Sequence, residues 1–284
     1  MYEFIDQQKG HHKLQRLCEL YGVTRSGYYA WRNRGISKRD SEDGQILAAI
    51  REIFEESGGT YGSPRIFQAL KRAGWKIGRK RVERIMRENR LKARAQKIYK
   101  RCPEVQQHFV RVPNRLVGKQ EEGPNEVWVG DITYLKANQK WHYLSVVMDR
   151  WSRKIVGWSL GKEKSSNLTL KTLQKAVNNR QPKQGLLFHT DRGSEYLSHT
   201  FQSKAEELGI TASSNRPRHM NDNAYMESFF HSLKSDRYHG NTFENIEELR
   251  KMVESYIPFY NQKRLHSGLG YHSPVEYESL NNAN

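Results

Sequence analysis

The chain has 284 residues, 36% of them hydrophobic, which is enough for roughly two to three folded domains and excludes an intrinsically disordered protein. Its formal net charge is +17, and +15 of that charge lies in residues 1–120. This concentration favours a nucleic acid as the partner, because Lys and Arg bound to phosphates release condensed counterions. The alternative is a surface that is merely basic and soluble.

Cysteine content and apolar runs exclude further classes. Only Cys18 and Cys102 occur, without a Cys-x-x-Cys pair, so we expect neither a disulfide framework nor a zinc knuckle. Residues 1–30 lack the apolar segment of a signal peptide. No run approaches the roughly 18 apolar residues that a membrane span needs. We therefore expect a cytoplasmic protein with no membrane partner.

Residues 13–20 and 24–31 predict two helices around a Tyr21-Gly22-Val23 turn, and Thr24 is expected to cap the second. This arrangement resembles a small helix-turn-helix. A polar linker is expected over Gly35 to Ser41. A second helical unit is then expected from about residue 45 to residue 91, interrupted at Ser57-Gly58-Gly59 and at Gly74.

The second helical unit is strongly basic. Residues 65–101 hold 15 basic and only 2 acidic side chains. A helix this basic fits a groove lined by phosphates, although a charge run is often only a solvated face. The candidate DNA-binding residues on its most basic helix are Arg79, Lys80, Arg81, Arg84 and Arg87.

From Gly123 the pattern changes to short apolar runs that predict strands. Three consecutive strands are followed by alternating helices and strands, which indicates a mixed α/β domain. The predicted strands are Val127–Leu135, Trp141–Met148, Ile155–Leu160, Gly185–His189 and Ile210–Ser213, and the helices are 168–177, Thr200–Leu208 and a long one from near Asp222.

Three carboxylates fall where this order of elements can bring them together. Asp131 lies within the first strand, Asp191 just after the fourth, and Glu227 on the helix after the fifth. Strand alternation places Asp131 on the face of Val127 and Val129, where an acid needs a partner such as a metal ion. Two hard cations held by carboxylates stabilise the attacking and leaving oxygens of a phosphoryl transfer.

Nearby residues have weaker assignments. Lys234 is seven residues beyond Glu227, so it shares a helix face with it and is a candidate for a DNA phosphate or an ordinary surface lysine. Gly193 is expected to let the chain turn sharply beside Asp191. Asp222 is expected to cap the Glu227 helix. Asp149 is expected to start a turn or pair with its neighbour, and Glu195 is a decoy candidate.

At this point the chain resembles a known family, the retroviral integrase superfamily and within it the larger-frame transposases of bacterial insertion sequences that move by copy-out and paste-in. The resemblance covers nearly the whole chain, and the 35 residues between Asp191 and Glu227 match the family's spacing. It is carried by the segments around these acids and by residues 61–66, 81–86, 222–230 and 260–274.

The resemblance implies a ribonuclease H-like catalytic core, with Asp131, Asp191 and Glu227 as the catalytic and metal-binding triad and Lys234 as the basic residue that follows. Two Mg²⁺ ions, replaceable by Mn²⁺, are implied. The reaction would be 3′-end nicking followed by strand transfer, and in this group the freed 3′-hydroxyl first joins the two ends of the element. Within the matching motifs we also expect DNA contacts from Arg65, Arg264 and His266.

The implied organisation is that of a nucleoid-associated protein with all-helical DNA-binding regions before an α/β core. The partners would be the terminal inverted repeats, target DNA and further copies of the chain on paired ends. The expected divisions are a helix-turn-helix-like region 1–40, a basic helical DNA-binding domain 41–103, a linker 104–122, the catalytic core 123–240 and a helical extension 241–284.

The chain departs from the family at two points. Viral integrases carry a zinc module that is missing here, and Glu195 stands where Gln is expected. The group often fuses an upstream frame with a leucine zipper onto such a chain. Since no sustained heptad repeat occurs here, an upstream-frame fusion partner is among the expected partners.

Two other functions remain open at the level of sequence. A non-catalytic regulator or accessory subunit that binds element ends would explain the basic region, but not three acids around one cleft. A ribonuclease H-like nuclease that acts on RNA or on hybrids would use the same acids on another substrate.

Overall fold

The structure is a computed structural model that describes residues 1–33, 38–94, 112–216 and 223–281. Parts of both predicted linkers, and the predicted cap Asp222, lie outside these ranges. Among the described residues, no helix combines the length and apolar character needed to cross a bilayer.

The first unit is a group of three short helices with a core of its own. Thr24 caps the third helix as predicted, since its hydroxyl accepts a hydrogen bond from the Gly27 amide at 3.0 Å. The first helix was not predicted, because no side chain caps it and only Ile5 on it is buried. The helices are α1 (Tyr2–Gln8), α2 (Leu14–Leu20) and α3 (Arg25–Arg32), and their core is Ile5, Leu17, Cys18 and Tyr28.

The second unit also consists of three helices, α4 (Lys38–Glu56), α5 (Ser63–Arg72) and α6 (Arg79–Glu88). The predicted breaks are present, because Gly58 and Gly59 end α4 and Gly74 follows α5 with φ values of +69°, +74° and +85°. The linker predicted to extend to Ser41 is wrong from Lys38 onward, since those residues form the first turn of α4.

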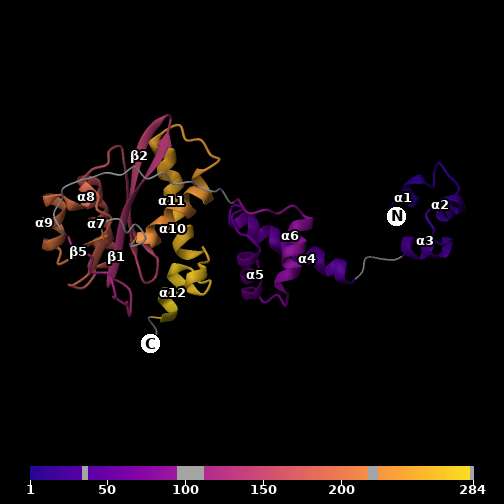
Figure 1. Cartoon of the computed structure of the whole chain (residues 1–284), viewed down its shortest axis with the longest axis horizontal. Helices are drawn as coiled ribbons and strands as arrows, with labels where there is room; N and C mark the ends of the chain where they lie inside the picture. Colours follow the sequence, from indigo (N-terminus) through magenta and orange to yellow (C-terminus); the bar gives the residue numbers. More distant parts are fainter. Residues whose placement is uncertain (34–37, 95–111, 217–222, 282–284) are drawn as a thin grey trace.

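A five-stranded sheet forms the centre of the third unit (Figure 1), in the order β3-β2-β1-β4-β5. The first three strands are antiparallel neighbours, whereas β4 and β5 run parallel to β1. Every predicted strand is therefore present within a residue or two of its predicted ends. The strands are β1 (Val127–Ala137), β2 (Lys140–Asp149), β3 (Ile155–Gly161), β4 (Leu187–Thr190) and β5 (Thr211–Ser214).

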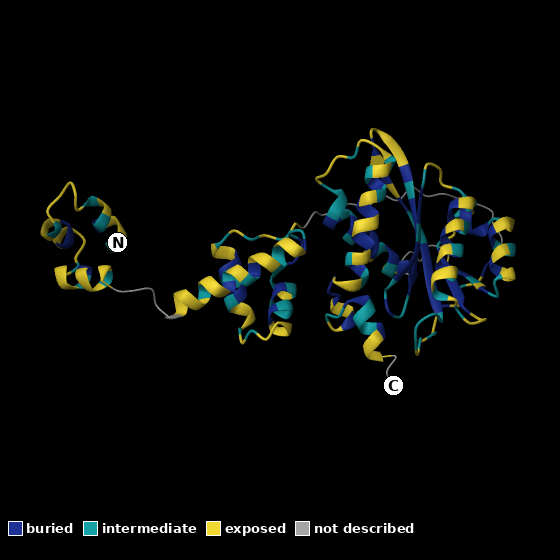
Figure 2. Ribbon diagram, turned by 180° about the vertical axis from the view of Figure 1, so that it is seen from behind, coloured by how far each residue is buried: buried dark blue, intermediate teal, exposed yellow. Residues whose placement is uncertain are grey.

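Helices cover both faces of the sheet (Figures 1 and 2). On one face Trp128 and Phe188 pack with α7 (Ser166–Arg180) and α9 (His199–Glu207), near the short helix α8 (Ser194–Leu197). On the other, Val129 and Leu135 pack against α10 (Ala224–Leu233) and α11 (Ile246–Gln262). Because α11 belongs to this core, the hydrophobic core continues past residue 240, where the catalytic region was predicted to end.

Three further helical elements complete the C-terminal part of the fold. They are η2 (Lys234–Tyr238) between α10 and α11, and η3 (Ser267–Leu269) and α12 (Pro274–Asn281) after α11. Glu278 on α12 is buried and pairs with Lys154 at 2.7 Å and Arg180 at 2.8 Å. These ion pairs fasten the C-terminal helix to β3 and α7. The extension is thus an integral part of the α/β unit.

Candidate active site

The first two predicted carboxylates lie side by side. Strands β1 and β4 are parallel neighbours with Gly130 opposite Thr190, so Asp131 and Asp191 each follow a paired residue. Adjacent strands are about 4.8 Å apart, which brings the two side chains into one site. Each carboxylate is oriented by an amide, since Asp131 accepts from the Ile132 N–H at 2.7 Å and Asp191 from the Gly193 N–H at 2.9 Å.

Strand alternation directs Asp131 toward the face that carries the third acid. Val129 and Leu135 belong to the core formed with α10 and α11, whereas Trp128 and Ile132 belong to the opposite one. Asp131 therefore lies on the α10 face, as predicted.

Helix α10 is tied to β1 at its first turn. Asn223, which is 3% exposed, donates from its side-chain amide to the carbonyl oxygen of Gly130 at 3.3 Å, directly before Asp131. Glu227 follows one helical turn later and is half-buried. Within the described ranges no three His, Cys, Asp or Glu side chains are close enough together to hold a metal ion. The structure thus joins Asp131 to Asp191 and places the Glu227 helix beside them, without a closed three-carboxylate cluster.

Gly193 is required for space. Its φ is −62°, which any residue adopts, so the turn beside Asp191 does not depend on the conformational freedom of glycine. A Cβ there would lie 2.9 Å from Asp191 Oδ1 and 2.5 Å from Glu195 Oε2. The preceding residue, Arg192, donates to the Asn215 carbonyl at 2.7 Å and holds the loop after β4 in place.

The buried acids create a local excess of negative charge. Burial raises the pKa of Asp191, against the lowering effects of the Gly193 hydrogen bond and of Lys164. Burial, followed by the charges of Asp131 and Asp191, raises the pKa of the Tyr196 hydroxyl well above its usual range. The Tyr196 hydroxyl is close enough to both acids for their charges to raise its pKa. This agrees with the strand register, which places Asp131 and Asp191 side by side. Carboxylates held in this way are ligands that a hard divalent cation prefers.

Glu195 lies next to this pair. Only 7% of its side chain is exposed, and one oxygen pairs with Lys164 Nζ at 3.0 Å. Its other oxygen has no hydrogen-bond partner among the residues described. Glu195 is therefore a fourth acid at the site, where the sequence left its role open. Lys164 was missed, because nothing in a charged loop marks one lysine as the partner of a distant glutamate. Asp149 instead begins a turn, accepting from the Ser152 amide at 3.0 Å.

Helix α10 runs into a π-helical turn that begins at Lys234. Lys234 is half-buried and keeps a right-handed helical backbone, with φ −67° and ψ −43°. It therefore stays at the end of the helix that carries Glu227. Its contact with a DNA phosphate remains a prediction.

The basic helix α6 has two kinds of arginine. Arg79, Lys80 and Arg87 are exposed, and Arg79 pairs with Glu83 on its own helix. Arg81 and Arg84 instead form ion pairs with Asp43 of α4, and the Arg81 pair is 2.7 Å long. These two arginines fasten α6 to α4, so the candidate DNA contacts on this helix reduce to the three exposed residues.

The structure does not place the other three predicted DNA contacts on an open surface. Arg264 is 5% exposed and pairs with Asp236 at 3.0 Å. His266 is 6% exposed and lies edge-on to the Tyr260 ring, with centroids 4.6 Å apart. Arg65 is half-buried and donates to the Leu265 carbonyl at 3.1 Å. DNA contact was expected for all three because the sequence shows that they are basic. It does not show that the fold buries them.

His266 makes the stability of the chain pH-dependent. Burial, then Arg264, Arg153 and Arg65, lower the pKa of His266 from 6.5 to about 3. Between these values the unfolded chain binds a proton that the folded chain does not, so the free energy of unfolding falls as the pH falls from 6.5 toward 3. We expect a loss of a few kcal/mol over this window, at about 1.4 kcal/mol per pKa unit.

Urea unfolding at several pH values, followed by circular dichroism, measures this effect. A His266→Gln chain should show a flatter dependence, whereas His11→Gln, at an exposed site, should not differ from the unaltered chain. Equal slopes for the His266→Gln chain and the unaltered chain would contradict the assignment.

Comparison with known proteins agrees with this geometry. Family models described as "Integrase core domain" match residues 121–220 and 227–281, and one described as "HTH-like domain" matches residues 41–99. The transposase InsF of insertion sequence IS3A from Escherichia coli is 34% identical over 285 aligned positions, which cover 99% of both chains. A 31 kDa protein of insertion element IS600 from Shigella sonnei is 33% identical over 92% of this chain and 97% of its own length.

Solved integrases are more distant. A simian T-cell lymphotropic virus intasome chain aligns with a TM-score of 0.48 and 15% identity, over 81% of this chain and 74% of its own. The HTLV-2 integrase catalytic core, solved with magnesium, aligns with a TM-score of 0.40 and 21% identity, over 55% of this chain and 97% of its own. The identity to InsF over the full length is what decides the family. The chain belongs to the insertion-sequence transposases of the IS3 family, enzymes with an integrase core and a helix-turn-helix-like domain.

Proposed function

We propose that the chain nicks the 3′ ends of its insertion sequence and transfers the freed strands, with Asp131, Asp191 and Glu227 as the catalytic acids. The observation that carries this proposal is the pairing of β1 with β4, which sets Asp131 beside Asp191. The Asn223 hydrogen bond to Gly130 supports it, because it fixes the start of the Glu227 helix at the same point of the sheet.

The donor set fits Mg²⁺ or Mn²⁺, since both prefer oxygen ligands and all three candidate ligands are carboxylates. The magnesium bound in the HTLV-2 integrase core supports this choice. Two such ions, when bound, activate the attacking oxygen and stabilise the leaving one. Asp131 and Asp191 would hold the ions, Glu227 would complete the ligand set, and Lys234 would pair with a neighbouring phosphate.

The helical units supply DNA binding in this proposal. The exposed Arg79, Lys80 and Arg87 of α6 contact phosphates of the terminal inverted repeats, and the first three helices bind a second part of the same end. The chain acts as an oligomer on paired ends, and an upstream-frame product is a candidate partner. We propose boundaries at about residues 37, 103 and 122, with 241–284 as an integral part of the catalytic unit.

A second candidate is a non-catalytic protein that binds element ends. The observation in its favour is that Asp131, Asp191 and Glu227 are not closed into one cluster in the described structure. In this case the acids would be ordinary buried and half-buried groups. The two proposals differ in metal-dependent cleavage.

The test uses the full chain and a duplex of the element's own terminal inverted repeat with flanking DNA. With Mg²⁺ or Mn²⁺ we expect a nick at the 3′ end of the element, followed by a joined product, both resolved on denaturing gels. Binding of Mn²⁺, followed by electron paramagnetic resonance, gives the number of ions per chain. Binding to the duplex without cleavage under any metal condition favours the second candidate, and cleavage of an RNA–DNA hybrid in preference to the duplex contradicts both.

Glu195 gives a sharper prediction about the metal. Its buried charge lies beside Asp191, so Glu195→Gln should raise the Mg²⁺ concentration for half-maximal nicking. The loss of one nearby screened charge is worth about 1 kcal/mol, or roughly fivefold in concentration. Glu206→Gln is the matched control, because Glu206 is exposed at the end of α9. An unchanged Mg²⁺ dependence in Glu195→Gln would remove Glu195 from the site.

A further inference from the structure

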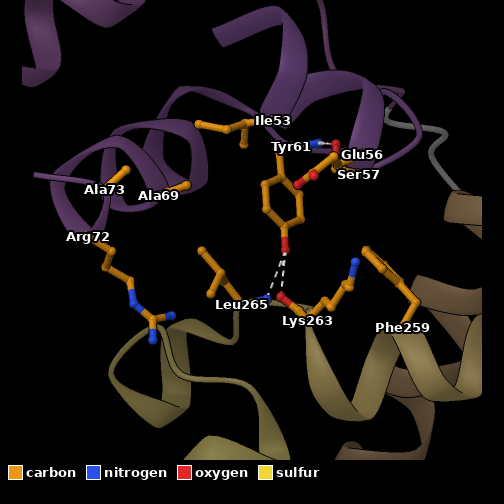
Figure 3. A pocket seen from close by; sticks show the side chains of 10 residues that line it. All are labelled: Ile53, Glu56, Ser57, Tyr61, Ala69, Arg72, Ala73, Phe259, Lys263 and Leu265. Atoms are coloured by element: carbon orange, nitrogen blue, oxygen red, sulfur yellow. Dashed lines mark hydrogen bonds between the residues drawn. The ribbon is translucent and has the colours of Figure 1, made fainter. Parts of the chain in front are cut away.

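Two sequence motifs that the active site does not use contact each other. Tyr61, just before α5, reaches the segment after α11 (Figure 3). Its hydroxyl accepts from the Leu265 amide at 2.9 Å and donates to the Lys263 carbonyl at 3.5 Å. Two stretches about 200 residues apart in the sequence thus form one contact between the second helical unit and the catalytic unit.

Leu265 is the centre of this contact. Its carbonyl oxygen accepts from Arg65 Nε at 3.1 Å, so side chains of the helical unit bond both its N–H and its C=O. The Leu265 side chain is 6% exposed and belongs to the hydrophobic core of α4, α5 and α6. The catalytic unit therefore completes the core of the helical unit with Leu265, and Tyr271 packs against the same core.

Four further contacts extend the connection. Arg72 donates to the Tyr271 carbonyl at 3.2 Å and pairs with Glu276 at 2.8 Å. Ser235 donates to the Arg94 carbonyl at 3.3 Å. Gly58 lies against Arg237, where a Cβ would be 1.9 Å from the guanidinium. We call this set of contacts, made by Tyr61, Arg65, Arg72, Gly58 and Arg94 with residues 235–237 and 263–276, the joint.

The joint connects with the helix that carries Glu227. Arg264, next to Leu265, donates to Ser232 of α10 and to Asp236 of η2, both at 3.0 Å. Asp236 also accepts from Tyr256 of α11 at 2.9 Å. Because Arg264 and Asp236 are almost fully buried, this network is held in one arrangement. Through Arg264, the segment that contacts the helical unit is thus also bonded to α10.

The two units meet at separate points. A cavity of about 360 Å³ remains between them, lined by Tyr61, Ala69, Phe259, Lys263 and Leu265 among others (Figure 3). An interface with such a gap has little apolar packing at that place. Together with the apolar contacts of Leu265 and Tyr271, the individual hydrogen bonds and ion pairs therefore fix the angle between the units.

We propose that the joint acts as a ruler, which holds α6 at a fixed distance from Asp131 and Asp191 and so determines which phosphodiester is cut. The inference rests on the proposed function. One base pair advances DNA by about 3.4 Å, so a small displacement of α6 shifts the reacting bond. A misplacement of about 1 Å is enough to reduce a reaction rate by roughly 100-fold. A DNA-binding unit on a loose tether would cut at several neighbouring bonds.

The test compares end duplexes with the native spacing and with one, two or three base pairs inserted between the repeat and the cut. The unaltered chain should cut one bond, and the insertions should reduce its cutting by about tenfold or more. A Tyr61→Phe/Arg72→Ala chain should cut two or more adjacent bonds. On the duplexes with inserted base pairs, its cutting should fall by roughly threefold or less. Lys71→Ala is the matched control, since Lys71 is exposed on α5 and outside the joint.

A reversed ion pair separates the ruler from general damage. Arg72→Glu should scatter the cuts, and adding Glu276→Arg should restore a single cut, because both side chains are more than a third exposed and tolerate exchange. Amide hydrogen exchange at Leu265 should be faster in Tyr61→Phe. If Tyr61→Phe fails to fold, the reversed pair decides alone.

The outcomes distinguish the two claims. The ruler is overturned if a joint variant still cuts the same single bond and still cuts the duplexes with inserted base pairs about tenfold less. That outcome leaves the proposed function intact. An unaltered chain that cuts several bonds also overturns the ruler. An unaltered chain with no metal-dependent nicking overturns the proposed function, and the ruler with it.

Discussion

An Asp191→Asn chain is expected to lose Mg²⁺-dependent nicking by about 1,000-fold or more, while it keeps its fold and its affinity for end DNA. The amide is the same size but carries no charge, and the charge is what holds the ion. Nicking of a labelled end duplex and a gel-shift titration of the same duplex measure the two properties separately.

The same substitution should not destabilise the fold. Since burial raises the pKa of Asp191, folding disfavours its charged form at neutral pH, and the neutral amide avoids that cost. The melting temperature should therefore stay the same or rise. Glu206→Gln, at an exposed acid, should leave activity unchanged. Full activity of Asp191→Asn would end the proposal of an acidic triad.

An Arg264→Leu chain is expected to lose about 3–5 kcal/mol of unfolding free energy, because it leaves the carboxylate of Asp236 buried without its cation. Asp236 is 6% exposed and would keep only the Tyr256 hydroxyl among the bonds described above. Denaturant unfolding, monitored by tryptophan fluorescence, gives the change.

An exposed pair provides the comparison. Arg250 pairs with Glu247 at 3.2 Å, and both side chains are at least a third exposed, so Arg250→Leu should cost at most about 1 kcal/mol. Adding Asp236→Leu to Arg264→Leu should recover part of the loss, because it removes the stranded charge. An Arg264→Leu chain as stable as Arg250→Leu would contradict the role given to this ion pair.

The sequence was sufficient for the strands of the sheet but not for their order. Apolar runs gave the strands, and Asp131 and Asp191 were expected together from their positions in and just after a strand. The parallel pairing of β1 with β4, which sets them side by side, is known only from the structure. The position of Glu227 is harder to predict. A helix is joined to a sheet by side-chain packing, whereas paired strands share a hydrogen-bonded register that fixes their residues.

Sequence reasoning was weakest for the basic residues. Arg81 and Arg84 pair with Asp43 on another helix, and Arg264, which follows α11, pairs with Asp236 of η2. Which basic side chain forms an ion pair within the chain depends on the tertiary structure. Hydrophobic periodicity and composition do not reveal it. An arginine-rich motif therefore predicted DNA contact at positions where the arginines form ion pairs within the protein.

Helix α11 has a practical consequence for how this gene tolerates interruption. Leu249, Val253 and Tyr256 of α11 are fully buried against the sheet face that also carries α10. A polypeptide that stops near residue 240 would lack α11 and expose the apolar sheet face that this helix covers. Exposed apolar surfaces of this kind promote aggregation and proteolysis. A premature stop codon there should therefore yield no persistent inhibitor of transposition, because the shortened product would be degraded before it could occupy an element end.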